Sequence, residues 1–223
     1  MDKIFFNDDY CMTDLVLDGL KNYYMEECDV SIIREINYLK SKYFDNENFD
    51  KIIGKNFYRF LLDTGHMKAR FHRGDQVAIG ISYSKLKGMQ IEGKINYDIV
   101  EQYNKSKQVC LITNHAGWLN REYVDDYLMP FRILIKSVSV KRLKELEFTD
   151  MLNLGLMFDD ETGLFGYMEA NKITNNKKSK WISKDITAAF KAMIEGWKGA
   201  DYWDKNPLLF VYWFKLISDL AFK

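Results

Sequence analysis

The chain has 223 residues and a mass of 26.4 kDa, and its 47% hydrophobic and 29% charged residues exclude an intrinsically disordered protein. Its 32 basic and 32 acidic side chains give a formal net charge of zero, which argues against a protein that holds long nucleic acid mainly by counterion release. A local basic groove is compatible with this sum, because a groove depends on where the charges lie.

The first third of the chain predicts a strand, a short helix, a second strand and then two longer helices. A strand begins at Ile4, apolar residues recur at helical spacing over 12–16, and a β-prone run follows Lys21. Asp29 is a suitable N-cap for the first long helix. The apolar stripes of the two long helices are Ile32, Ile33, Ile36 and Leu39 in one, and Phe49, Ile52, Ile53, Phe57, Phe60 and Leu61 in the other.

Short strands and polar stretches are predicted in the middle of the chain. The segment 70–82 is typical of a half-buried strand after a glycine turn, and 109–112 of a short apolar strand. Between them, 84–108 is polar and is interpreted as a loop with one short helix. In the long strand 129–140 the apolar residues change phase near Lys136, which indicates a β-bulge.

The last third predicts one short helix, one long helix and a closing strand. Thr149 is a candidate cap for a one-turn helix that Gly155 ends, and the clearest helix is 184–198, with Ser183 as its cap. The strand 208–215 is apolar on both faces. Strands outnumber helices without alternating regularly with them, so we expect an α+β fold around a mixed sheet or a small barrel.

The sequence lacks the common cofactor and metal motifs, among them Walker A, GxGxxG, HExxH and the EF-hand loop. The three histidines have no metal-site spacing, and the three cysteines form no CxxC pair, so we predict no metal and no cofactor. Cys110 and His115 are a weak candidate thiol–imidazole pair. Without a signal peptide or a long apolar run, we expect a cytoplasmic protein with no membrane partner.

Two basic stretches are candidates for binding a phosphate backbone. In the first, residues at alternate positions share one side of an extended chain. In the second, a lysine-rich stretch around Trp181 is predicted to be a loop that could suit a nucleic-acid backbone, and a merely solvated loop is the favoured alternative. The first consists of His66, Lys68, Arg70, His72 and Arg73, and the second of Lys172, Lys177, Lys178, Lys180 and Lys184.

Several short motifs, in order, resemble the ASCH-domain proteins of phages and prophages, a branch of the PUA-like superfamily. They are LVLDGLK (15–21, with a GxK signature), RGDQVAI (73–79) followed by Ser82-Tyr83, HAGWLNR (115–121), LMPFRI (128–133) continued by 138–146, the helix 150–156, and 190–197 with WDKNP (203–207) through Phe214. Single motifs of this kind are weak, but seven in one order are hard to obtain by chance.

This resemblance implies one domain over residues 1–223, a small β-barrel with helices at its rim. The segments of about 29–66, a helical pair, and about 84–109, a polar stretch, are then insertions. The resemblance also implies a cleft facing Lys21 in which RNA or a modified nucleotide binds. Some bacterial relatives hydrolyse the acyl group of N4-acetylcytidine with a Lys, a Thr and a Glu. In this sequence Lys21 matches the lysine, but Tyr24 and Leu154 fall at the other two positions.

Because a leucine cannot transfer a proton, a binding module of phage or prophage type is our first hypothesis and the amidohydrolase, with Lys21 as its catalytic residue, is the alternative. A third hypothesis is a phage protein that binds or inhibits a host protein or ribonucleoprotein in the host cytoplasm; it requires that the helices at 29–63 expose an apolar face. The candidate nucleic-acid-binding residues are Lys21, Tyr24, Lys68, Arg70, Arg73, Tyr83, Trp118, Asn120, Arg121 and Arg132.

Overall fold

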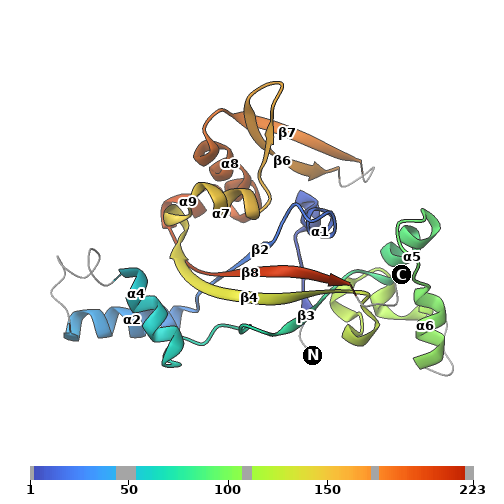
Figure 1. The fold of residues 1–223 in the computed structure, drawn as a ribbon, viewed down its shortest axis with the longest axis horizontal. Helices are drawn as coiled ribbons and strands as arrows, with labels where there is room; N and C mark the ends of the chain where they lie inside the picture. The colour runs from blue at the N-terminus through green and yellow to red at the C-terminus, as the bar shows by residue number, and fades with distance from the viewer. Residues whose placement is uncertain (1–2, 44–53, 107–111, 172–175, 219–223) are drawn as a thin grey trace.

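A computed structural model describes residues 3–43, 54–106, 112–171 and 176–218, and every structural statement below concerns these residues. The chain combines helices and strands in an α+β arrangement (Figure 1). The strands are β1 (Lys3–Ile4), β2 (Tyr23–Glu27), β3 (Gln76–Ile79), β4 (Phe131–Arg142), β5 (Met157–Asp159), β6 (Leu164–Ala170), β7 (Lys177–Ser183) and β8 (Leu208–Ser218).

The helices lie around the ends and one side of these strands. They are α1 (Met12–Leu17), α2 (Val30–Tyr43), α4 (Gly54–Asp63), α5 (Tyr83–Ile91), α6 (Ile99–Ser106), α7 (Phe148–Asn153), α8 (Ile186–Lys198) and α9 (Tyr202–Lys205). Short 3₁₀ turns connect them: η1 (Asp8–Tyr10), η2 (Ile112–Asn114), η3 (Ala116–Trp118), η4 (Arg121–Tyr123), η5 (Asp126–Leu128) and η6 (Leu143–Glu145). Within the described ranges, none of the helices is both long and apolar enough to cross a membrane.

The strands form two sheets. The larger has the order β1-β3-β4-β8-β2, with a parallel β1–β3 pair and antiparallel pairs elsewhere, and the smaller has the order β5-β6-β7. Over the described residues β1 and β2 are the outer strands of an open sheet, so the small closed barrel expected from the sequence is not seen there. The α+β class itself is confirmed.

The central pair β4–β8 agrees with the sequence pattern. The register of the two strands shifts between Ile135 and Ser137, which confirms the predicted β-bulge at Lys136. Most of β8 is buried on both faces, from Leu208 to Tyr212, and these five side chains belong to the hydrophobic core. The apolar run of β8 is therefore explained by the position of this strand in the core.

The helical insertion at 29–66 agrees in part with its predicted apolar stripes, since the stripe residue Phe60 is exposed and Ile32 and Ile33 are half-buried. The side chain of Asp29 accepts a hydrogen bond from Ser31 N at 2.7 Å, as expected for an N-cap. Ile36 of α2 and Phe57 and Leu61 of α4 are buried in the same core as the sheet. The predicted stripe residues at 49–53 lie outside the described residues.

Several predicted boundaries are wrong. The segment 84–108 contains two helices, α5 and α6, and most of the predicted strand 109–112 lies outside the described residues. Thr149 lies inside α7, whose capping box is formed by Glu147 and Asp150. At α8 the cap is Asp185, two residues after Ser183, and its side chain accepts a hydrogen bond from Thr187 N at 2.9 Å.

The lysine-rich stretch predicted as a loop is also different. Its described part, Lys177–Ser183, is strand β7 and pairs with β6, so the prediction of a loop is wrong there. The first four side chains of β7 are exposed and three of them are lysines, so the strand lacks the apolar alternation by which strands are detected. Cys110 lies outside the described residues, so its pairing with His115 stays a prediction.

The tight β6–β7 contact predicts that alanine destabilises the protein at Gly166 but not at Gly88. A Cβ on Gly166 would collide with the main-chain oxygen of Lys180, which no rotamer change can relieve. We expect Gly166→Ala to lower the free energy of unfolding by roughly 1–3 kcal/mol in urea denaturation. Gly88→Ala is the control: it meets nothing within 4 Å inside α5 and should be neutral or stabilising by up to about 1 kcal/mol. Equal denaturation midpoints for Gly166→Ala and the wild type would contradict this packing.

Candidate functional site

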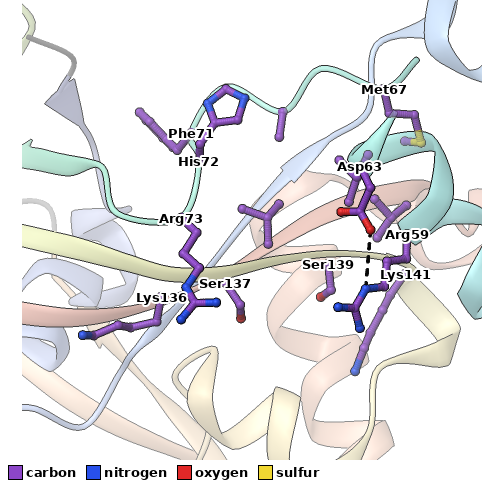
Figure 2. Close-up of a pocket in the computed structure, with 14 residues that line it drawn as sticks. Arg59, Asp63, Met67, Phe71, His72, Arg73, Lys136, Ser137, Ser139 and Lys141 are labelled. Atoms are coloured by element: carbon purple, nitrogen blue, oxygen red, sulfur yellow. Dashed lines mark ion pairs between the residues drawn. The ribbon is translucent and has the colours of Figure 1, made fainter. Parts of the chain in front are cut away.

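A basic groove of about 620 Å³ lies between α4 with the segment after it and the second half of β4. Figure 2 shows its lining residues, with α4 and residues 67–73 on one side and β4 on the other. The lining side chains with ionisable groups are Arg59, Asp63, His72, Arg73, Lys136 and Lys141. The fixed charges among them are therefore four positive and one negative, in a chain whose net charge is zero.

One wall of the groove is built by an extended segment with alternating burial. Met67, Ala69 and Phe71 are buried and fix this segment to the core, while the side chains between them are exposed. This confirms that Lys68, Arg70 and His72 share the outer side of an extended chain. Of the basic residues predicted here, His72 and Arg73 line the groove.

The opposite wall is an open strand edge. The turn at 72–75 closes on β4 through the hydrogen bonds Gly74 N to Ile135 O and Ile135 N to Asp75 O, both 2.9 Å. Beyond the bulge, no described strand pairs with this edge of β4.

The direction of the peptide groups along this edge follows from the end of the strand. Leu143 N donates to Pro207 O on the β8 side, while Arg142 N donates to the Glu145 carboxylate on the other side. Because N–H directions alternate along a strand, the N–H groups of Val138 and Val140 point away from β8, toward the groove.

Two of the four cations are already paired, which leaves the other two for a ligand. Lys141 Nζ lies 2.5 Å from Asp150 Oδ2 of α7, and Arg59 Nε lies 3.7 Å from Asp63 Oδ2. Arg73 and Lys136 have no acidic partner among the described residues. Figure 2 shows the Arg73 side chain extending toward β4, where Lys136 and Ser137 lie.

Lys21 is buried and lies outside this lining. Its side chain is 4% exposed, and its Nζ donates to the main-chain oxygen of Leu154, just after α7, at 2.6 Å. Burial lowers the pKa of Lys21 from 10.5 to about 7. The structure therefore brings Lys21 next to position 154, where the acceptor is a peptide oxygen and not a carboxylate.

Tyr24 and Arg70 are brought together on the opposite face of the sheet from α7. The Tyr24 and Tyr212 rings lie 5.9 Å apart, Arg70 N donates to the Tyr212 hydroxyl at 3.2 Å, and that hydroxyl donates to Glu26 at 3.3 Å. Burial raises the pKa of Tyr212 and, with the nearby Glu26 carboxylate, that of Tyr24. This cluster stabilises the contact between β2, β8 and the 67–73 segment.

The remaining predicted site residues lie at the far end of the molecule, around η3 to η5. There Tyr83 is fully buried and its hydroxyl accepts from Asp125 N at 2.7 Å. Trp118 packs against the core, and Asn120 caps η4. The structure places Tyr83, Trp118, Asn120 and Arg121 away from the groove, in contacts that stabilise the turns.

A shallower hollow of about 430 Å³ next to these turns is a poorer candidate for binding an anion. It is lined by Asn120 and Arg121, but also by Asp8 and Asp9. Arg121 already donates to Phe6 O at 2.6 Å and to Asp8 at 3.1 Å. Its positive charge is therefore offset inside the site.

The groove residues that the sequence did not single out are Arg59, Lys136 and Lys141. The bulge at Lys136 was the available signal, since bulges are frequent beside binding sites. No protein-family model matches the chain, and neither the curated proteins nor the solved structures give a significant match. Among the residues described, no three His, Cys, Asp or Glu side chains are grouped so that they could hold a metal ion.

The burial of Lys21 predicts a pH-dependent stability. Between its folded pKa of about 7 and its unfolded value of 10.5, the unfolded chain binds a proton that the folded chain does not. Raising the pH through this window therefore stabilises the folded protein, by roughly 1 kcal/mol per pH unit for one proton. We expect Lys21→Met to remove this contribution from the unfolding free energy measured between about pH 7 and pH 8.5, a range that lies within this window.

The control is Lys178→Met, which removes an exposed lysine. The dependence of its unfolding free energy on pH should remain that of the wild type. Unfolding free energies of wild type and Lys21→Met that run parallel over this window would show that Lys21 stays charged in the folded protein.

Proposed function

We propose that this protein binds nucleic acid, with the phosphate backbone lying in the groove along the free edge of β4. The observation that carries the proposal is the pair Arg73 and Lys136, two cations without an acidic partner among the described residues, beside unpaired peptide groups of a strand edge. Guanidinium and ammonium groups are the usual partners of phosphate oxygens, and main-chain N–H groups add sequence-independent contacts.

The charge distribution supports a binding role better than the net charge suggests. Coulombic attraction acts locally, because exposed charges more than about 10 Å apart are largely screened at ordinary salt. With Arg59 and Lys141 paired, the groove keeps two cations without an acidic partner among the described residues, and these can attract a polyanion although the whole chain is neutral.

The resemblance to phage and prophage ASCH-domain proteins, of PUA-like fold, points in the same direction, since it implies RNA or a modified nucleotide as the ligand. The groove lies near α7, the helix whose end also contacts Lys21. RNA is therefore the first polymer to test, with the cytoplasm as the expected location.

An amidohydrolase acting on an acylated nucleoside is the second candidate. It is favoured by one observation, the buried Lys21 amine with a pKa of about 7, which is largely uncharged just above neutral pH. Tyr24, at the position of the family threonine, pairs with Tyr212 on the face away from α7, and Leu154 supplies only a peptide oxygen. Nucleic-acid binding is therefore the first candidate function. Release of acetate from N4-acetylcytidine by the protein would make the amidohydrolase the first candidate instead.

A host-protein ligand would be favoured by an exposed apolar face on the helical insertion. In the part of α2 and α4 that is described, Ile36, Phe57 and Leu61 are buried, while Tyr38 and Phe60 are exposed on separate helices. The buried stripe favours nucleic acid as the ligand over a protein partner.

Charge reversal in the groove tests the proposal. We expect the double variant Arg73→Glu, Lys136→Glu to lose about tenfold or more in affinity for a single-stranded RNA oligonucleotide at low salt, measured by fluorescence anisotropy. The slope of log K against log salt should fall by roughly 0.7 for each lost cation.

The control for charge alone is Lys178→Glu combined with Lys184→Glu, which makes the same change in net charge in the other basic stretch. This control should bind as the wild type does. Loss of affinity in the control alone would move the binding surface to β7, and no binding by the wild type to RNA or DNA would refute the proposed function.

A further inference from the structure

Beside the groove, one face of the large sheet is covered at both ends and open between them. At one end, helix α7 crosses this face. Its Asp150 is paired with Lys141 of β4, and its Asn153 O accepts a hydrogen bond at 3.2 Å from the N–H of Asn22, which precedes β2. At the other end, Lys3 of β1 donates to Val124 O at 2.6 Å, so the η4–η5 turns cover the edge there.

The exposure of side chains along β8 locates the open part. Val211, Trp213 and Lys215 share one face because they alternate along the strand. Val211 is 2% exposed, whereas Trp213 is 46% exposed and Lys215 is also exposed. The covered part of this sheet face therefore ends between Val211 and Trp213.

Trp213 lies in a row that leads directly to the groove. Its Cα partners are Ser137 on β4 and Tyr23 on β2, so the three side chains project from the same face. Ser137 lines the groove, next to Lys136. Neighbouring strands are about 4.8 Å apart, so Trp213 is one strand away from the phosphate site proposed above.

The Trp213 ring has no structural partner that explains its position. Among the described residues it makes no aromatic contact or side-chain hydrogen bond, and about half of its surface is exposed. A large aromatic surface left open beside cations suits the π-face of a nucleobase, and the exposed Lys215 lies on the same face.

We propose that Trp213 is a nucleobase-stacking residue, so that the ligand of the groove is single-stranded and its bases turn from the β4 edge onto this open face. The inference rests on the proposed function. In a duplex the bases are paired and stacked on each other, so only an unpaired strand can place its backbone at Arg73 and Lys136 and a base on Trp213. Because every base has a π-face, the contact discriminates by strandedness more than by sequence.

The test compares oligonucleotides with and without bases. A ten-nucleotide oligo-uridine, the corresponding oligo-thymidine, a duplex and an abasic oligonucleotide of equal length are titrated at one salt concentration. We expect the wild type to bind the base-bearing single strands about 5- to 100-fold more tightly than the abasic strand. Trp213→Leu, which keeps an apolar side chain but has no ring, should remove this difference and leave the affinity for the abasic strand unchanged.

Trp213→Phe and Phe148→Leu complete the design. The first restores a ring and should recover part of the preference; the second removes another exposed aromatic side chain, on α7, and should change nothing. Urea denaturation of each variant verifies that it is folded.

The outcomes separate the two proposals. If Trp213→Leu binds the base-bearing strands as the wild type does, or if the wild type binds the abasic or duplex ligand equally well, stacking on Trp213 is refuted while nucleic-acid binding stands. If the wild type binds none of the four ligands, the proposed function fails and stacking on Trp213 fails with it.

Discussion

The unequal length of two neighbouring strands is the constraint on which the candidate site depends. β4 extends from Phe131 to Arg142, but β3 pairs only with Arg132 to Leu134, and the 72–75 turn closes the ladder at Ile135. The bulge at Lys136 follows at once. Beyond it the peptide groups of β4 face a groove and not a strand, and unpaired strand edges are surfaces on which proteins commonly bind extended chains.

Two ion pairs take up two of the four cations of this groove, and one of them also holds β4 to α7. Lys141 is bound to Asp150, which caps α7, and Arg59 to Asp63 within α4. The buried Asp150 carboxylate makes the first of these the stronger constraint, whereas the exposed Arg59–Asp63 pair contributes little to stability. Arg73 and Lys136 are thus distinguished from the other cations by the absence of a partner among the described residues.

The sequence predicted the elements whose apolar pattern is strong and missed those without one. The long helix α8, the strands β4 and β8 and the bulge follow from apolar periodicity. Strand β7 is lysine-rich and could not be told from a loop. Arg73 was predicted as a binding residue, but Lys136 and Lys141 join it only through tertiary structure, since they are about sixty residues away along the chain. Trp213 was hidden because its apolar neighbours made both faces of the strand read as buried.

The helix α7 connects the buried lysine to the open face. It is held at one end by Lys141 on β4 and at the other by the main-chain contacts of Asn22 and by Lys21, which donates to Leu154 O. These contacts fix how far α7 extends over the sheet, and hence where Val211 is covered and Trp213 is not. In this arrangement Lys21 serves as a positioning residue: its amine donates to a buried peptide oxygen, and burial lowers its pKa because the charged ammonium is costly to desolvate.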